Sequence, residues 1–399
     1  MDKKKEFKKG NLQEEGPKRI EKKNHRRRIV RLCGAVLGVL VLVLAAVLWD
    51  STAFDGLRRA VIYASAEKDE TGCAKLYTYA AEKDGCYASL EGSLVQATAR
   101  RILLMGEDGA VRYHADVKFN KSAVATNGKV AAVYDIGGTD IHVLDDRGLV
   151  RCLTAEGEIL SCTVNEKGAM AVTINKSGYK AAVTVYNESG EKVFAFHSAD
   201  RFLMTAAVSR DGRRMAAVAL GQAEGVFTSS LVVYSLDSTE PLLDVPMTGK
   251  AVYDVDMVGR RWCAVGEDGM YFLSADGKKS EDSIFYDFEG TYLRRCSLGG
   301  DGFAAALLGR YQYGTQTHLV TVDEEGMQLA ILEAEKEVLS LSAAGKYVAV
   351  LYSDELVIYD RNLEVCARLE ELSSARQVLM RADGSAVLVG ADSASLYLP

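Results

Sequence analysis

The sequence predicts an all-β protein, an eight-bladed β-propeller preceded by an N-terminal transmembrane helix. Three observations lead to this expectation. One long uncharged apolar run lies near the start of the chain. The remainder consists of short alternating strands, separated by acidic turns that end in glycine. These strands recur with a period of ~40 residues, which is typical of four-stranded propeller blades. The spacing favours eight blades, with seven as the alternative.

Composition supports a large folded body. The chain has 399 residues, of which 48% are hydrophobic and 26% are charged, so disorder throughout is excluded. The formal net charge of −7 is the sum of a basic N-terminal segment and an acidic remainder. Residues 1–31 hold 13 Lys+Arg and 5 Asp+Glu, whereas residues 50–399 hold 35 and 50. An acidic body of this kind is a poor partner for nucleic acid.

The apolar run Leu32–Trp49 contains 18 residues and no charge. As a helix it extends over ~27 Å, close to the ~30 Å thickness of the hydrocarbon core. Trp49 has the position of an interfacial aromatic residue. Its uniform Leu/Val content argues against a buried core helix, and Trp49-Asp50 is a poor signal-peptide cleavage site. We therefore expect an uncleaved signal anchor over residues 29–49, with the lipid bilayer as its partner.

Four arginines at positions 26, 27, 28 and 31 lie on the N-terminal side of this run. Their charge predicts that residues 1–28 form a disordered basic arm in the cytoplasm. The body is then extracytoplasmic, on a single-pass protein of the cell membrane.

Residues 50–72 are expected to be a linker with a short helical stretch, and residues 73–399 to form the propeller. Turns such as 165–168 and 382–384 combine Asp or Asn with Gly, which closes short hairpins. They lack the alternating carboxylates of a calcium loop. The eight units begin near Cys86, Lys118, Gly157, Arg201, Lys250, Gly290, Lys336 and Ser373.

The second strand of nearly every unit is rich in Ala, as in 131–133, 216–218 and 304–306. Small residues there allow neighbouring sheets to pack face to face. The last unit has only three strands before Pro399, whereas residues 74–80 precede the first unit without a partner. Pairing residues 74–80 with residues 394–398 would complete the last blade and remove two exposed edges.

Three segments carry a resemblance to a known family. They are the order of basic arm, membrane helix and Leu57-Arg58-Arg59, the run 178–187 with 190–194, and the turn 209–216. In these features the chain resembles a family of uncharacterised bacterial single-pass membrane-anchored β-propeller proteins within the WD40-like and quinoprotein-like superfamily. The resemblance covers about residues 30–399 and implies the fold and the anchoring. It implies no catalytic residue, and the Gly-His and Trp-Asp signatures of WD40 repeats are absent from residues 73–399, where the only Trp is Trp262.

Loops between the second and third strands of a blade share one face with the connections between blades. Three such loops, 176–180, 221–229 and 310–317, are long or unusual. Aromatic residues and Arg are the usual anchors of recognition surfaces. We therefore predict a binding site on one rim of the propeller, formed by Tyr179, Phe227, Arg310, Tyr311 and Tyr313. Packing of these loops onto neighbouring blades is the alternative.

Motifs for catalysis, metals and cofactors are not found. The five histidines have no metal-ligand spacing, and neither a phosphate-binding loop nor a nucleophile elbow occurs. We expect no catalytic residue, no metal and no cofactor. The competing hypothesis is a quinoprotein-like or lyase-like enzyme with an axial active site. Its charged candidates on the inner strands are Asp254, Asp256, Arg294 and Arg295.

The body contains seven cysteines, an odd number, so they cannot all pair with one another. Cys73 and Cys86 flank the proposed closing strand, and a disulfide between them would fasten the ring. A second candidate pair is Cys152 and Cys162. The alternative is that all of them are buried small hydrophobic residues.

Together these features predict a non-enzymatic binding or scaffolding module that is anchored at the bacterial cell envelope. Its expected partner is a protein or a cell-wall glycan. A sensor that signals through the cytoplasmic arm is a further alternative.

Overall fold

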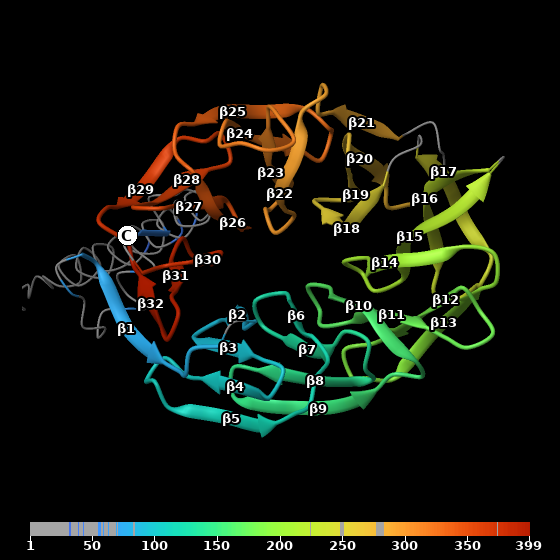
Figure 1. Ribbon diagram of the computed structural model, residues 1–399, viewed down its shortest axis with the longest axis horizontal. Coiled ribbons are helices and arrows are strands. Elements are labelled where there is room, and N and C mark those ends of the chain that lie inside the picture. The colour runs from blue at the N-terminus through green and yellow to red at the C-terminus, as the bar shows by residue number, and fades with distance from the viewer. Residues whose placement is uncertain are drawn as a thin grey trace, which may run out of the picture. The chain divides into compact units, whose positions relative to one another are not determined.

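The computed structural model describes residues 32, 39, 43, 55, 56, 59, 63, 69, 71–82, 84–223, 225–247, 251–276, 283–372 and 374–399. In this part of the chain, 32 strands form eight antiparallel sheets of four strands each. The sheets follow one another around a common axis in chain order (Figure 1). The predicted eight-bladed β-propeller is confirmed, and the seven-bladed alternative is wrong.

The first four blades each run from an inner to an outer strand in chain order. Blade 1 comprises β2 (Cys86–Leu90), β3 (Ser93–Ala97), β4 (Arg101–Met105) and β5 (Val111–Asp116). Blade 2 comprises β6 (Ser122–Thr126), β7 (Ala131–Asp135), β8 (Asp140–Asp145) and β9 (Gly148–Thr154). Blade 3 comprises β10 (Glu158–Val164), β11 (Met170–Asn175), β12 (Ala181–Tyr186) and β13 (Lys192–Ser198). Blade 4 comprises β14 (Phe202–Val208), β15 (Arg214–Ala223), β16 (Val226–Ser235) and β17 (Pro241–Met247).

Blades 5 to 7 repeat this order, and blade 8 takes its outer strand from the N-terminal side. Blade 5 comprises β18 (Val252–Val258), β19 (Arg261–Gly266), β20 (Gly269–Ser274) and β21 (Ile284–Asp287). Blade 6 comprises β22 (Tyr292–Ser297), β23 (Phe303–Gly309), β24 (Thr317–Asp323) and β25 (Gln328–Ala334). Blade 7 comprises β26 (Val338–Ala344), β27 (Tyr347–Tyr352), β28 (Leu356–Asp360) and β29 (Val365–Leu369). Blade 8 comprises β30 (Gln377–Met380), β31 (Ala386–Val389), β32 (Ser393–Tyr397) and β1 (Cys73–Thr78).

Strand β1 closes the ring. It pairs antiparallel with β32, from Cys73 opposite Tyr397 to Thr78 opposite Ser393, and the two strands lie side by side in Figure 1. The main-chain N–H of Leu398 donates to the carbonyl of Gly72 at 3.1 Å, which extends the pairing past the strand ends. This is the pairing that the incomplete eighth unit predicts, and it gives both strands the partner that an edge strand lacks.

Eight apolar clusters form the core, one between each pair of neighbouring blades. The second strands are buried on both faces, as β23 and β27 are along their whole length, because each one packs against two neighbours. This double packing explains their small residues. The cluster between blades 8 and 1 includes the fully buried Tyr77 together with Leu94 and Leu396.

The acidic turns close hairpins, as expected. In the turn after β10, the Oδ1 of Asn165 accepts the N–H groups of Lys167 at 3.0 Å and Ala169 at 2.9 Å. Gly168 has a φ of +89°, a conformation that favours glycine. Asp323 accepts two N–H groups in the same way in the turn after β24.

The N-terminal predictions fall largely on residues that are not described. The chain divides into two units, Met1–Ala60 and Val61–Pro399. The basic arm 1–28 lies outside the described residues, and so does the predicted transmembrane helix 29–49, except for Leu32, Val39 and Val43, which are helical. Among the described residues no helix has the length and apolar character to cross a membrane.

Candidate binding face

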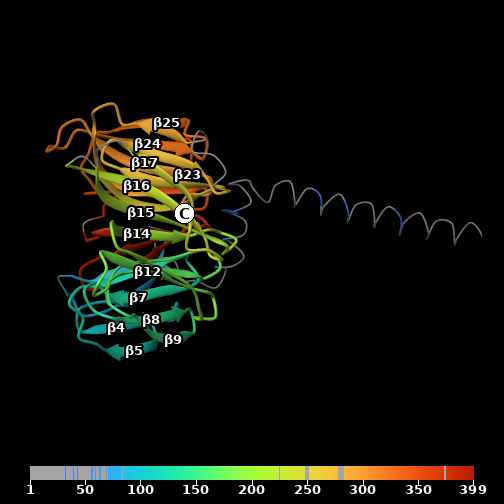
Figure 2. The same ribbon diagram turned by 90° about the vertical axis from the view of Figure 1, so that its right-hand side faces the viewer.

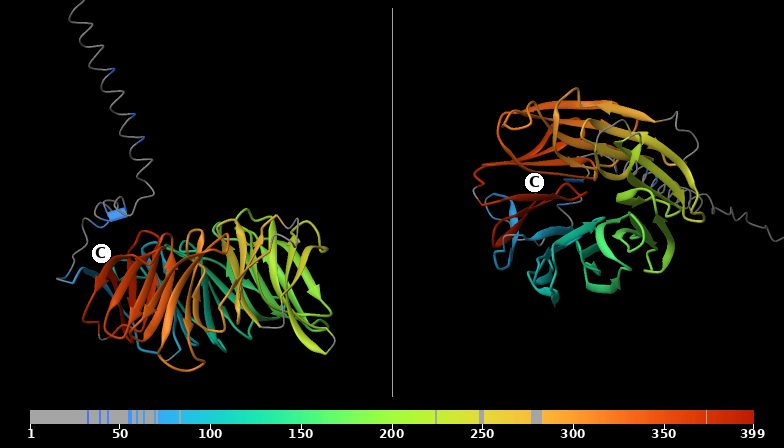
Figure 3. Two further views of the ribbon diagram at one scale, coloured as in Figure 1. Left: turned by 90° about the horizontal axis from the view of Figure 1, so that it is seen from above. Right: turned by 45° about the vertical axis from the view of Figure 1, so that its right-hand side comes forward.

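The chain direction gives the propeller two different faces. Neighbouring strands of a blade are antiparallel, so the first and third strands start at the face of the propeller at which the second and fourth strands end. The connections between strands therefore lie on two opposite faces (Figures 2 and 3). We call the face with the second-to-third-strand loops and the blade connections the loop face. The other face, with the first-to-second and third-to-fourth turns, is the turn face. All five predicted rim residues lie in second-to-third-strand loops or at their ends, and therefore on the loop face.

In blade 3, the β11–β12 loop carries Tyr179. Its ring packs on the imidazole of His197 at the end of β13, with centroids 4.7 Å apart. The next residue, Lys180, places its ammonium 4.9 Å from the ring centroid of Phe202, the first residue of β14. These contacts join blade 3 to blade 4 and present aromatic and cationic groups together.

In blade 4, β15 and β16 are ten residues each and continue their pairing beyond the rest of the sheet, to Ala223 opposite Val226. The inner partner β14 ends its pairing at Leu220. Val226 and Phe227 near the tip are each 60% exposed. The long hairpin therefore holds two apolar side chains out on the loop face.

In blade 6, the β23–β24 loop carries Arg310, Tyr311 and Tyr313. The guanidinium of Arg294, on inner strand β22, donates through Nη2 to the carbonyls of Tyr311 at 2.9 Å and Gly314 at 3.5 Å. The Arg310 guanidinium lies 5.8 Å from the ring centroid of Tyr311. Tyr313 is 81% exposed. Arg294 thus holds the backbone of the β23–β24 loop through these hydrogen bonds, while the rings of Tyr311 and Tyr313 remain exposed.

The structure adds five apolar residues that sequence analysis missed. They lie at the loop-face ends of inner strands, and they are Leu160, Phe202, Met204, Tyr253 and Tyr292. Leu160, Met204 and Tyr253 occupy irregularities in the register of β10, β14 and β18 with their second strands. Such a bulge breaks the alternation of side chains and turns an extra residue outward. In the sequence, the only sign of such a bulge is that the beginning of the inner strand contains one residue more than strict alternation of buried and exposed side chains allows.

These apolar side chains concentrate on one half of the loop face. Ten large apolar side chains there are 40% to 81% exposed, and all of them belong to blades 3 to 6: Leu160, Tyr179, Phe202, Met204, Val226, Phe227, Tyr253, Tyr292, Tyr311 and Tyr313. We call this set the apolar rim. The other exposed large apolar residues of the described propeller lie on outer strands, with the exception of Met327. Concentrations of exposed apolar side chains are typical of interaction sites.

The charged axial candidates do not converge on one point. On β18, Asp254 and Asp256 pair with Val265 and Cys263, whose side chains pack toward blade 6. On β22, Arg295 pairs with Leu307, whose side chain packs toward blade 7. Arg294 is engaged by the β23–β24 loop.

The two carboxylates have unusual titration behaviour. Burial raises the pKa of Asp256 to about 7, with a smaller contribution in the same direction from Asp254. Burial also raises the pKa of Asp254. Each carboxylate accepts the N–H of the following residue, at 2.9 Å for Asp254 and 2.7 Å for Asp256. The side chain of Asp254 is nevertheless exposed. Inner-strand side chains near the axis have protein on several sides but still contact water.

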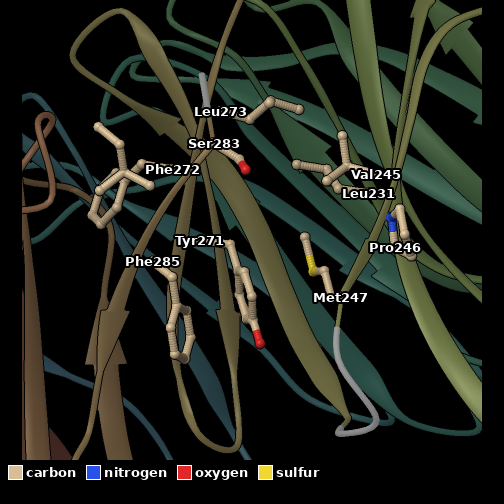
Figure 4. A pocket seen from close by; sticks show the side chains of 10 residues that line it. Leu231, Val245, Pro246, Met247, Tyr271, Phe272, Leu273, Ser283 and Phe285 are labelled. Carbon is tan, nitrogen blue, oxygen red and sulfur yellow. The ribbon is translucent and has the colours of Figure 1, made fainter. Parts of the chain in front are cut away.

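An apolar cavity of about 240 Å³ separates the outer parts of blades 4 and 5 (Figure 4). Its lining consists of Leu231, Val245, Pro246, Met247, Tyr271, Phe272, Leu273, Ser283, Ile284 and Phe285. None of these lining side chains is charged. Among the described residues there is also no group of three His, Cys, Asp or Glu arranged to hold a metal ion.

The predicted Cys73–Cys86 disulfide is wrong, because both thiols are free. Cys73 begins the outer strand β1 at the turn face, whereas Cys86 begins the inner strand β2 at the loop face. The intervening strand therefore carries them to opposite ends of the sheets. Cys86 instead donates to the carbonyl of Ser122 at 3.2 Å. Cys152 and Cys162 are also free.

The fold is that of an eight-bladed β-propeller whose loop face carries exposed apolar side chains on blades 3 to 6. The chain belongs to a family of unknown function (DUF5711), whose model matches residues 69–379. No curated protein matches the chain in sequence.

Solved structures support the fold. The C-terminal WD40 domain of Sif2 aligns with a TM-score of 0.57 at 11% identity, covering 81% of this chain and 97% of that one. The Dos1 propeller aligns with a TM-score of 0.56 at 12% identity, covering 81% and 95%. BamB from Moraxella catarrhalis aligns with a TM-score of 0.53 at 12% identity, covering 81% and 98%. At these identities the similarity concerns the fold alone.

Proposed function

We propose that this protein is a non-enzymatic binding or scaffolding module and that it docks a protein partner through the apolar rim. The observation that carries the proposal is the concentration of exposed aromatic and aliphatic side chains on blades 3 to 6 of one face. Arg310 beside the ring of Tyr311 supplies the Arg and aromatic groups that are enriched at protein interfaces. A propeller is a rigid disc with variable loops, which suits this role.

The proposal includes the location. The uncharged run 32–49 and the arginines before it support a signal anchor in the cell membrane, with the propeller outside. The chain enters the propeller at the turn face, where the Tyr63 hydroxyl donates to Asp383 at 2.8 Å and β1 begins. The apolar rim is on the opposite face, away from the point of attachment.

Site-specific photo-crosslinking tests the proposal. A benzophenone amino acid at Tyr311 or Tyr313 should give the same crosslinked product in native membranes. The same amino acid at Leu242 or Val365, which are exposed on outer strands, should not. Changing Phe227 to Ala should weaken the product without changing the melting temperature. Equal crosslinking from both sets of positions would contradict the proposal.

The same experiment separates the two partner classes. A proteinaceous partner gives a discrete crosslinked band that protease removes. Binding of the purified protein to cell-wall sacculi, lost on substitution of Tyr311 and Tyr313 by Ala, would instead indicate a glycan. A protease-protection assay on intact protoplasts tests the orientation, since an extracytoplasmic propeller should be digested without lysis.

A further inference from the structure

The outer two strands of blade 2 bring a cysteine and a histidine together. His142 on β8 is the direct cross-strand partner of Cys152 on β9, so the sheet register itself fixes the pair. The Sγ of Cys152 lies 3.7 Å from Nδ1 of His142. This is within hydrogen-bonding reach for sulfur, and it is the arrangement in which an imidazole accepts a thiol proton.

A tyrosine from the neighbouring blade reaches the same nitrogen. The hydroxyl of Tyr113, on β5, lies 3.0 Å from Nδ1 of His142. Phe119, which is buried, packs edge-on against the imidazole with ring centroids 6.2 Å apart. In the tautomer with the imidazole proton on Nε2, Nδ1 can accept a hydrogen bond from the Tyr113 hydroxyl or from the Cys152 thiol. Burial lowers the pKa of His142, which keeps the ring neutral and able to accept.

Access distinguishes Cys152 from the buried thiols. Its side chain is exposed, whereas Cys162 and Cys263 are buried. Burial raises the pKa of the Cys162 thiol to about 12, which keeps that thiol protonated and inert. Cys366 supplies a natural comparison, because it is also exposed and also lies on the outer strand of its blade. Its thiol contacts the carbonyl of Glu364 at 3.8 Å.

We infer that Cys152, with His142 as its base, is a reactive thiol that undergoes exchange with low-molecular-weight disulfides. The proton of the Cys152 thiol passes to Nδ1 of His142, and the resulting thiolate attacks one sulfur of the disulfide. A new S–S bond forms to Cys152 as the original S–S bond breaks. The departing thiolate takes the proton from His142, so the products are one mixed disulfide and one free thiol. This modification site is separate from the apolar rim and does not depend on it.

Stopped-flow reaction with the aromatic disulfide 5,5′-dithiobis(2-nitrobenzoate) tests the inference on the full-length chain. The C366S variant retains Cys152, and the C152S variant retains Cys366, while all other thiols are common to both. We expect Cys152 to react roughly tenfold faster than Cys366 at pH 7, because the His142 imidazole beside Cys152 can accept the thiol proton. Mass spectrometry after incubation with oxidised glutathione should then find the mixed disulfide on Cys152.

Two further variants examine the neighbours of the thiol. In the C366S background, H142Q should lower the rate of Cys152 to about that of Cys366. In the C152S background, H142Q should leave the rate of Cys366 unchanged, which controls for a general loss of structure. Y113F should raise the rate of Cys152, since the thiol no longer competes for Nδ1. Equal rates for Cys152 and Cys366, no effect of H142Q, or an unchanged or lower rate in Y113F would overturn the inference.

Discussion

The pKa values of Asp254 and Asp256, two carboxylates on an inner strand near the propeller axis, illustrate how the surroundings of a side chain change its protonation. Asp256 has more protein around it than Asp254, although only one residue separates them on β18. Burial disfavours the ionised form, and a neighbouring carboxylate disfavours it further. The folded protein therefore holds a proton on Asp256 at pH values where the unfolded chain has released it.

A pH-dependent gain in stability should follow when Asp256 is changed to Asn. The folded pKa of about 7 is above the unfolded value, so the ionised carboxylate costs stability as pH rises from about 4 to 7. The Asp256 side chain keeps some contact with water, which screens its charge. We therefore expect the free energy of unfolding of the variant to rise by only about 1–2 kcal/mol at pH 8, less than the whole change in pKa would give. Near pH 4, where Asp256 is protonated, the two proteins should have equal stability.

Chemical denaturation at pH 4, 6 and 8 measures this effect. The matched control is Asp254→Asn, on the same strand but with a more exposed side chain, which should gain less at pH 8. A gain in the Asp256 variant that is the same at all three pH values would exclude titration as its cause.

At the level of the strand, the second strands show why small residues recur. Ala305 on β23 is fully buried and packs in the cluster between blades 6 and 7. Its neighbours along β23 pack alternately toward blades 5 and 7. A larger side chain has no solvent side toward which it can turn, so it must displace a neighbouring sheet.

Changing Ala305 to Leu should therefore lower the free energy of unfolding by about 2 kcal/mol through overpacking. The comparison variant is Ala110→Leu, because Ala110 lies exposed beside the β4–β5 turn. That variant should stay within about 0.5 kcal/mol of the parent. Thermal unfolding of the two variants side by side measures the difference, and equal melting temperatures would contradict the packing argument.

The alternation of side chains also sets the limit of what the sequence reveals at this level. Period-two alternation and glycine turns placed the first unit at Cys86, where β2 begins, and the third near Gly157, beside the start of β10. Period-two alternation did not reveal that Leu160 and Tyr253 are exposed, because a bulge shifts the alternation by one residue at each position. Spacing along the chain likewise suggested the Cys73–Cys86 bridge, although an intervening strand separates its two ends.

For the whole molecule, closure depends on a strand that is distant in sequence. The last unit lacks an outer strand, which made the pairing with β1 predictable from the repeat alone. Four of the ten residues of the apolar rim were predictable too, since they lie in long loops or at their ends. The concentration of that rim on four blades was not, because it depends on which strand ends meet around the ring.

Truncation tests the role of the closing strand. A chain that begins at residue 71 retains β1, whereas a chain that begins at residue 82 exposes the edge of β32 and removes the buried Tyr77. We expect the longer form to stay soluble and to elute without aggregates. The shorter form should aggregate or melt at least about 10 °C lower, because an open edge strand and a cavity are created together. Size-exclusion chromatography and thermal melts measure both, and equal behaviour would show that the ring does not need this strand.

The place where the chain enters and leaves the propeller has a practical consequence. Tyr63, the start of β1 and the end of β32 all belong to the turn face. A purification tag, a fluorophore or a biosensor chip coupled through the C-terminus is therefore held on the side remote from Tyr311 and Tyr313. Immobilised protein should present these tyrosines to the flowing solution, whereas coupling through a cysteine introduced at Tyr313 should block them.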